Sequence, residues 1–96
     1  MQRDDVLTLL HAHKVALARL FGVTDLALFG SVVRDEARAD SDIDILVAFD
    51  GPATSKRYFG VQFYLEDLLG CSVDLVTVKA LRKELRPSVE REAVHV

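Results

Sequence analysis

Apolar residues near the N-terminus recur with the period of an α-helix. Between residues 3 and 21 the apolar positions that set the pattern lie four, seven and four residues apart, on one helical face. They are Val6, Leu10, Leu17 and Phe21. Asp4 and Asp5 suit the first turn of this segment, and Gly22 is a typical residue after the last turn. We therefore predict an amphipathic helix over residues 3–21.

A second segment with helical period covers residues 56–69, and its apolar arc is wide. Four apolar positions lie three, four and three residues apart and define one face. They are Tyr58, Val61, Leu65 and Leu68. Phe59 and Phe63 extend the arc sideways, and Gly70 suits the end of the helix. Two interpretations of the wide arc stay open: packing in the core, or a surface that binds a partner.

Short apolar runs bounded by turn signals predict three buried strands, two between these helices and one after the second helix. The runs cover residues 24–29, 42–49 and 72–78. Residues 31–37 read as a short helix after the first strand, and Asp50-Gly51-Pro52 is a strong turn signal after the second.

The C-terminal region has a helical pattern that is interrupted by a proline. Residues 80–93 contain Pro87, and a proline inside a helix costs roughly 3 kcal/mol. We predict a short helix before a break near Arg86 and a second helix with Pro87 in its first turn. The predicted order is helix, strand, helix, strand, helix, strand, helix. It indicates an α/β (α+β) fold, one domain over residues 1–96 with a small mixed β-sheet packed with helices.

Two carboxylates open the second predicted strand. Asp42 and Asp44 are two residues apart, so in a strand they point to the same face. Carboxylates about 4 Å apart repel by roughly 4 kcal/mol at an effective dielectric near 20. A divalent cation removes this repulsion, and Mg²⁺ prefers carboxylate oxygens together with phosphate oxygens. The alternative is an ordinary strand start whose two carboxylates are solvated.

The glycine and serine that follow the first strand supply groups that suit an anion. Gly30 allows close approach to the backbone, and Ser31 is a strong helix N-cap. A helix N-terminus presents free N–H groups to a phosphate. The alternative is a plain helix cap. Facing a pair of acids, such a phosphate loop is the equipment for handling a nucleoside triphosphate.

A third carboxylate, Asp74, lies inside an otherwise apolar predicted strand. Such a residue is out of place in a buried strand unless it has a task. If residues 72–78 pair with residues 42–49, Asp74 can join Asp42 and Asp44 around a metal ion. The alternative is a carboxylate at a sheet edge that points to solvent.

These residues resemble the signature of the DNA polymerase β-like nucleotidyltransferases. Gly30-Ser31, ten residues, and then Asp42-Ile43-Asp44 match the pattern of that superfamily, as does Arg34. Val73-Asp74-Leu75-Val76 is similar to its third-acid strand. Within the superfamily the chain most resembles the minimal nucleotidyltransferases (MNT), antitoxin partners of HEPN ribonuclease toxins. A glycine often follows the motif arginine, whereas Asp35 does so here.

The resemblance implies a fold, an activity and a partner. It implies the nucleotidyltransferase core and the antitoxin of a type VII-like toxin–antitoxin pair, a protein adenylyltransferase that transfers AMP from ATP to a tyrosine of a HEPN toxin. Asp42, Asp44 and Asp74 would be the catalytic and metal-binding residues and would hold two Mg²⁺ ions. Gly30 and Ser31 would bind the triphosphate, and Arg34 would support it or the loop.

Other functions fit parts of the sequence. A contact-only antitoxin would block its toxin by binding and would carry a vestigial site. A nucleotidyltransferase for a small molecule or RNA would need a further acceptor site, which the sequence does not reveal. Basic residues before the last predicted helix form either a solvated face or a contact for nucleotide phosphates or an acidic partner. They are Lys79, Arg82, Lys83 and Arg86.

Charge, cysteine content and the length of the apolar runs limit the partners and the cellular location that we expect. A net charge of −3 argues against non-specific duplex binding, which depends on clustered Lys and Arg. One cysteine, Cys71, gives no disulfide framework, and no apolar run approaches the roughly 20 residues that cross a membrane. The N-terminus has no pattern of a secretory signal. We therefore expect a cytoplasmic protein without direct nucleic-acid binding. That it works with ATP and a protein partner is what the resemblance implies.

Overall fold

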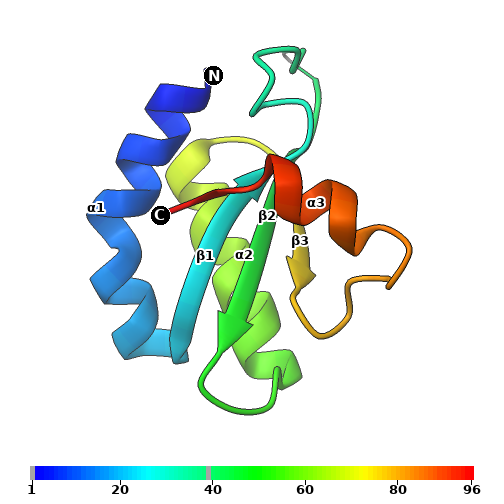
Figure 1. Cartoon of the computed structure of the whole chain (residues 1–96). Helices are drawn as coiled ribbons and strands as arrows, with labels where there is room; N and C mark the ends of the chain where they lie inside the picture. The colour runs from blue at the N-terminus through cyan, green and yellow to red at the C-terminus, as the bar shows by residue number, and fades with distance from the viewer. Residues whose placement is uncertain (1, 39) are drawn as a thin grey trace.

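The computed structural model describes residues 2–38 and 40–96 and contains three helices and four strands within them (Figure 1). In chain order the elements are α1 (Arg3–Phe21), β1 (Val23–Phe29), β2 (Ile43–Phe49), α2 (Ser55–Leu69), β3 (Val73–Thr77), α3 (Arg86–Glu92) and β4 (Val94–His95). The helix predicted for residues 3–21 is confirmed at both ends. The three predicted strands and the helix predicted for residues 56–69 are confirmed to within one residue at each end.

The strands form one mixed sheet in the order β3-β2-β1-β4. β1 pairs antiparallel with β2 and with β4, whereas β2 and β3 are parallel. A parallel pair needs a crossover, and α2 provides it between β2 and β3. The predicted small mixed sheet is therefore confirmed, and β3 and β4 are its edge strands.

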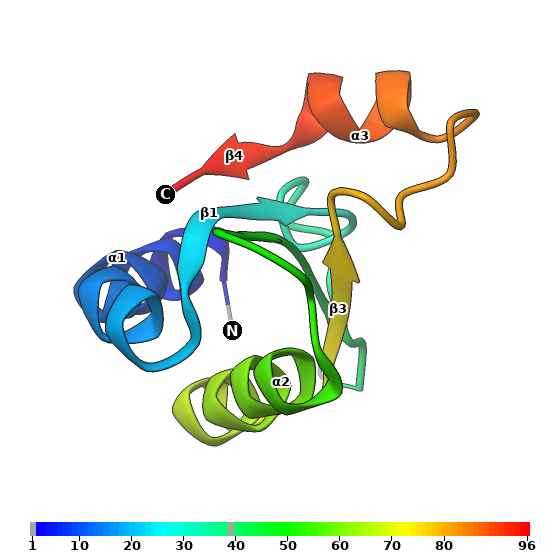
Figure 2. The same cartoon turned by 90° about the horizontal axis from the view of Figure 1, so that it is seen from below.

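The two faces of the sheet are covered unequally. Figure 2 shows α1 and α2 on one face and α3 on the other. The main core lies under α1 and α2, where Leu10, Leu65 and Ile45 have no exposed surface. A smaller cluster of buried side chains lies under α3. It consists of Ala27, Leu46, Leu81 and Val89.

Common capping residues set the ends of α1 and α2. Gly22 and Gly70 adopt left-handed conformations with φ 75° and 69° and close α1 and α2, as predicted. The Thr54 side chain accepts a hydrogen bond from the Arg57 N–H at the start of α2. No helix within residues 2–38 and 40–96 is long and apolar enough to cross a membrane.

The helix predicted for residues 31–37 is wrong, because this segment forms a series of tight turns. The N–H groups of Val33, Arg34 and Asp35 each donate to the carbonyl three residues earlier, whereas an α-helix needs bonds across four residues. The β-branched pair Val32-Val33 disfavours helix. Asp35 then takes a left-handed φ of 55°, which stops any continuation.

The region before Pro87 also differs from the prediction. Residues 78–85 contain turns rather than a short helix, because so few residues cannot repay the cost of helix nucleation. The second half of the prediction is confirmed, since α3 begins at Arg86 with Pro87 in its first turn. The sequence analysis missed β4, whose two residues pair with Ala27 and Leu28 of β1.

Candidate active site

The register of two parallel strands brings two predicted site residues together. Asp44 of β2 lies directly opposite Asp74 of β3. Two residues further along, Leu46 belongs to the cluster under α3, so Asp44 and Asp74 lie on the α3 side of the sheet. The pairing of these strands, which was the condition for Asp74 to join the other acids, is present. Because β3 is an edge strand, Asp74 is also exposed to solvent. This matches the alternative interpretation of Asp74, a carboxylate at a sheet edge.

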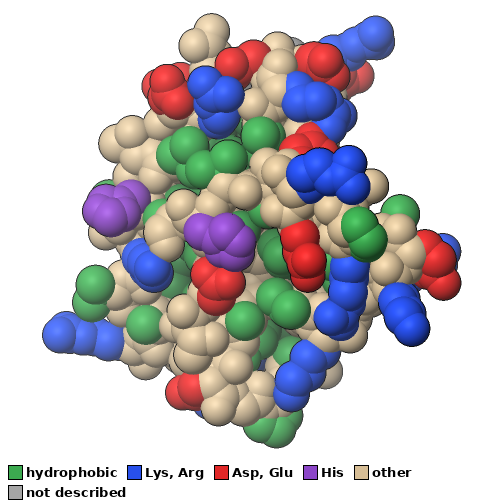
Figure 3. All heavy atoms as spheres, in the orientation of Figure 1, with side chains coloured by type: hydrophobic (Ala, Val, Ile, Leu, Met, Phe, Trp, Pro, Cys, Tyr) green, Lys and Arg blue, Asp and Glu red, His purple; other side chains and the backbone are tan. Residues whose placement is uncertain are grey.

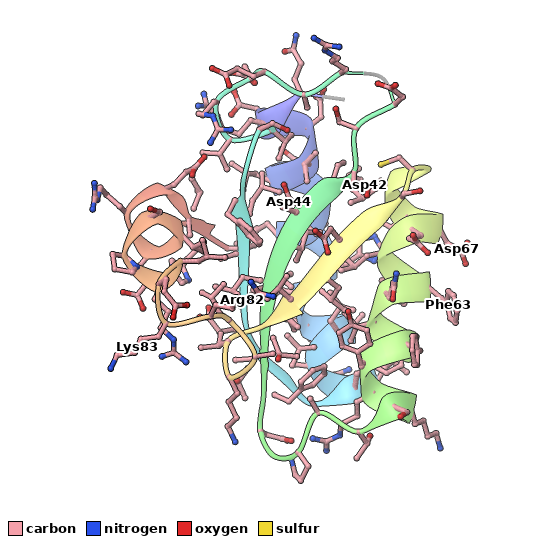
Figure 4. All side chains as sticks on the ribbon, turned by 90° about the vertical axis from the view of Figure 1, so that its right-hand side faces the viewer. Asp42, Asp44, Phe63, Asp67, Arg82 and Lys83 are labelled. Atoms are coloured by element: carbon pink, nitrogen blue, oxygen red, sulfur yellow. The ribbon has the colours of Figure 1, made fainter. Side chains whose placement is uncertain are left out.

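Asp42 lies one residue before β2, at the same end of the strand as Asp44 (Figure 4). The pKa of Asp44 is raised to about 6, first by burial, then by the negative charge of Asp74 and a hydrogen bond with it, and further by Asp42. Arg34 acts in the opposite direction and lowers this pKa. The two other acids therefore already act on Asp44, and a cation placed among them would relieve the repulsion.

The three acids do not form a closed metal cage. Among the described residues, no group of three or more His, Cys, Asp or Glu side chains is arranged to hold a metal ion. Mg²⁺ characteristically binds one or two carboxylates and completes its shell with water and substrate phosphates. An adjacent Asp44–Asp74 pair with Asp42 beside it therefore fits Mg²⁺ that arrives with a nucleotide, and would not fit a structural metal.

Gly30 makes room for the Asp44 carboxylate. Its φ of 79° is left-handed, and a Cβ built here would collide with the carboxylate, whose Cγ lies 2.9 Å from that position. We predicted that this glycine serves close approach to a ligand. The nearest group to its missing side chain is instead Asp44, so Gly30 positions the acid and the turn relative to each other.

Ser31 opens the turn segment and is no helix N-cap. Its carbonyl accepts hydrogen bonds from the N–H groups of Arg34 and Glu36. In the described part of the chain, the backbone N–H group of Ser31 has no backbone hydrogen-bond partner, so it can donate to an anion. Val32, 1% exposed, packs into the main core and anchors the turns. The sequence analysis missed this anchor.

Arg34 joins the turn segment to α3. Its guanidinium forms ion pairs with Glu36, at 3.0 Å, and with Glu92 near the end of α3. Both carboxylates raise the pKa of Arg34. Of the two predicted roles for Arg34, this geometry matches support of the loop. Glu92 was missed, because only the folded chain brings it to a residue so far away in sequence.

The basic cluster before α3 divides into two kinds of residue. Arg86 donates hydrogen bonds to the Val78 and Leu81 carbonyls and so holds its own loop together. Lys79, Arg82 and Lys83 are exposed. Lys and Arg side chains follow the right-hand side of Figure 3 with Asp and Glu among them. In Figure 4 Arg82 and Lys83 lie away from the end of β2 that carries Asp42.

Comparison with known proteins defines the class. The pattern of the family described as "Nucleotidyltransferase domain" matches residues 10–96. This chain therefore belongs to the nucleotidyltransferase domain family. It is 42% identical over 93 residues to the protein adenylyltransferase MntA of Thermococcus cleftensis, a match that covers 97% of this chain and 94% of the relative.

Solved structures with this fold include minimal nucleotidyltransferases. One structure described in those terms has a TM-score of 0.78 and 38% identity and covers 98% of this chain and 95% of its own. A second is a complex from Shewanella oneidensis of a tri-AMPylated HEPN toxin with an MNT antitoxin. The match has a TM-score of 0.64 and 22% identity and covers 92% of this chain and 69% of that one. At this identity the second match establishes the fold alone.

Proposed function

We propose that this chain is the antitoxin of a toxin–antitoxin pair and transfers AMP from ATP to a tyrosine hydroxyl of a HEPN ribonuclease toxin. The observation that carries the proposal is the register that sets Asp44 beside Asp74, with the Gly30 turn packed against Asp44. Protein adenylyltransferase is the name of the Thermococcus relative, which this chain matches over almost the whole length of both. The Shewanella complex supports a HEPN partner, since its toxin carries AMP.

The residues of the site have distinct tasks in this proposal. Asp42, Asp44 and Asp74 would hold two Mg²⁺ ions, which supply charge neutralisation at the phosphates and lower the pKa of the acceptor hydroxyl. The N–H group of Ser31 would donate to the triphosphate. Arg34, held by Glu36 and Glu92, would keep the turn segment in place.

The transfer itself is an in-line substitution at phosphorus. The tyrosine oxygen forms a bond to the α-phosphorus of ATP, the bond from that phosphorus to the bridging oxygen breaks, and pyrophosphate leaves. Asp74, exposed at the sheet edge, would accept the phenolic proton. A phenol has an ordinary pKa near 10, which is within the lowering that metal ions produce.

Transfer would silence the toxin through charge and bulk. Each AMP adds a phosphodiester charge and a base next to a site that must bind RNA phosphates. Cytoplasmic action without direct nucleic-acid binding by this chain fits the proposal, since its substrates would be ATP and a protein.

The test needs a HEPN ribonuclease, which is first sought in the gene next to that of this chain. Incubation with ATP and Mg²⁺ should raise the intact mass of that protein by whole AMP units on a tyrosine and abolish its RNase activity. Asp44→Asn should lower the rate of AMP transfer by roughly 1,000-fold or more, because it removes a carboxylate that would hold Mg²⁺ at the phosphates. Asp40→Asn, which changes an exposed acid just before β2, is the matched control and should transfer normally. No adduct under conditions where ATP binds would refute the proposal.

A contact-only antitoxin is the second candidate, and the open arrangement of the acids favours it. An arrangement without a preformed three-ligand cluster, in the part of the chain described, is also what a vestigial site would have. Growth assays separate the two functions at equal expression. The Asp42→Asn/Asp44→Asn double variant should fail to protect cells if the antitoxin is an enzyme, and should protect them fully if contact is sufficient.

A further inference from the structure

The outer face of α2 carries two stacked aromatic rings that no part of the described chain covers. Phe59 and Phe63 are 50% and 61% exposed, and their ring centroids lie 6.3 Å apart with an interplanar angle of 25°. Core packing, one of the two interpretations of the wide apolar arc, is therefore wrong for these two residues. Figure 4 shows Phe63 pointing outward from α2. Exposed aromatic rings of this kind are typical of protein interfaces.

The rings are held in place from within. Tyr58 lies edge-on to Phe59, with centroids 5.2 Å apart, and its hydroxyl donates a hydrogen bond to the Leu75 carbonyl of β3. Phe59 in turn stacks on Phe63. The aromatic face is thus attached to the sheet and is presented in a fixed arrangement, which lowers the entropy lost on binding.

Opposite charges stand at the two ends of this face. Lys56, Phe59, Phe63 and Asp67 are spaced by three, four and four residues, so all four follow one stripe along the helix. Lys56 and Asp67 are exposed, and neither forms an ion pair with another described residue. Figure 4 shows Asp67 on the same outward side as Phe63.

The stripe is complementary to itself when reversed. The midpoint of Phe59 and Phe63 is Val61, and the midpoint of Lys56 and Asp67 lies between Val61 and Gln62. A two-fold axis through this point sets the rings of one copy against the rings of the other. The same axis sets each Lys56 opposite the Asp67 of the other copy. Such a self-complementary surface is what a two-fold symmetric interface requires.

From this self-complementarity we infer that α2 is a dimer interface, at which it packs antiparallel against α2 of a second copy of this chain. The interface goes beyond the proposed function and does not depend on it. Asp44 and Asp74 lie on the α3 side of the sheet, whereas α2 covers the other side (Figure 2). Both acid sites therefore stay open in the dimer, and loss of transfer activity would leave the dimer intact.

Charge variants test the antiparallel arrangement. Lys56→Asp and Asp67→Lys should each raise the dimer dissociation constant roughly 3- to 30-fold, because both symmetric ion pairs become repulsive. The double variant Lys56→Asp/Asp67→Lys should restore it. An equimolar mixture of the two single variants should form heterodimers, since each like-charged chain meets its opposite. Sedimentation velocity over a concentration series measures all four samples.

Variants of the rings test the apolar centre. Phe63→Ser should weaken the dimer by roughly 100-fold, since aromatic residues at the centre of an interface carry much of its binding energy. Val15→Ser is the matched control, because Val15 is 63% exposed on α1 and lies outside the stripe. Circular dichroism confirms that both variants fold.

Three outcomes would overturn the inference. They are a wild-type chain that is monomeric throughout the concentration series, a dimer that survives Phe63→Ser, and single charge variants that do not pair in the mixture. If Phe63→Ser leaves self-association unchanged and weakens binding of the HEPN protein, the face serves that partner and not a second copy.

Discussion

The two faces of the sheet differ in function: one carries most of the hydrophobic core, and the other carries the acids of the candidate site. In the described chain, fifteen buried residues form the cluster under α1 and α2, whereas four form the cluster under α3. The larger cluster draws on both helices and three strands. The smaller one shares its face of the sheet with Asp44, which is half-buried, and Asp74, which is exposed. Most of the free energy of folding therefore comes from one face, and the other keeps room for charged groups.

This division explains how a small domain can carry repelling acids. Asp44 has a raised pKa, which means that its ionised form is unfavourable in the folded protein. Burial of apolar surface contributes roughly 25 cal/mol per Å², so the larger cluster can offset that cost. Three changes sharpen the comparison, and the largest effect is expected in the main core.

Truncation of a leucine should cost more under α2 than under α3. Leu65 has no exposed surface, so Leu65→Ala should lower the free energy of unfolding by about 3–5 kcal/mol through lost burial and a rigid cavity. Leu81 is 9% exposed in the smaller cluster, and Leu81→Ala should cost about 2 kcal/mol because its surroundings can relax. Urea unfolding of both variants gives the two values. Equal losses would contradict the unequal division.

Gly30 tests how tightly the α3 face is built around Asp44. Gly30→Ala should lower stability by about 2–3 kcal/mol, from the left-handed φ and from the collision with the Asp44 carboxylate. In the double variant with Asp44→Ala the collision is removed and part of the loss should return. Thermal unfolding of the wild type, both single variants and the double variant measures the coupling. Strict additivity would show that the two positions do not meet.

The smallest effect is a dependence of stability on pH. The folded pKa of Asp44 is about 6 and its ordinary value is 3.8, so the folded state binds the proton more tightly than the unfolded state. The stabilisation from this group is complete below about pH 4 and is lost as the pH rises through about 6. Asp44→Asn should flatten this part of the curve of melting temperature against pH, whereas Asp40→Asn should leave it unchanged. Parallel curves for Asp44→Asn and wild type would show that Asp44 does not cause this pH dependence.

Local patterns predicted most of the fold. The apolar stripe of α1 is long enough to fix its period, and the runs that became β1, β2 and β3 are bounded by turn residues. The turns after Gly30 could not be told from a helix, because both begin with the same residues and differ only in which carbonyl each N–H selects. β4 is two residues long, and its pairing with β1 depends on the path of the whole chain.

The candidate site could be predicted in part for the same reason. Asp42, Asp44 and Asp74 stand out because carboxylates interrupt or precede apolar strands, and Gly30-Ser31 has a recognisable spacing to them. Glu92 gives no such signal, since it is one of several charged residues in α3 and meets Arg34 only in the folded chain. The sequence does not predict the contact between Gly30 and Asp44, because it depends on the absence of a Cβ atom at Gly30 in the folded chain.

The contact between Gly30 and Asp44 gives a steric reason for glycine at position 30. Its presence in a related sequence is therefore not by itself a sign of nucleotide binding. A lineage that stopped binding nucleotides but retained Asp44 would still be constrained to glycine at position 30, since a larger residue would collide with the acid. The glycine and the second aspartate should therefore be inherited together. In a survey of related genomes, their joint presence counts as a single observation, and loss of the glycine should follow loss of the aspartate.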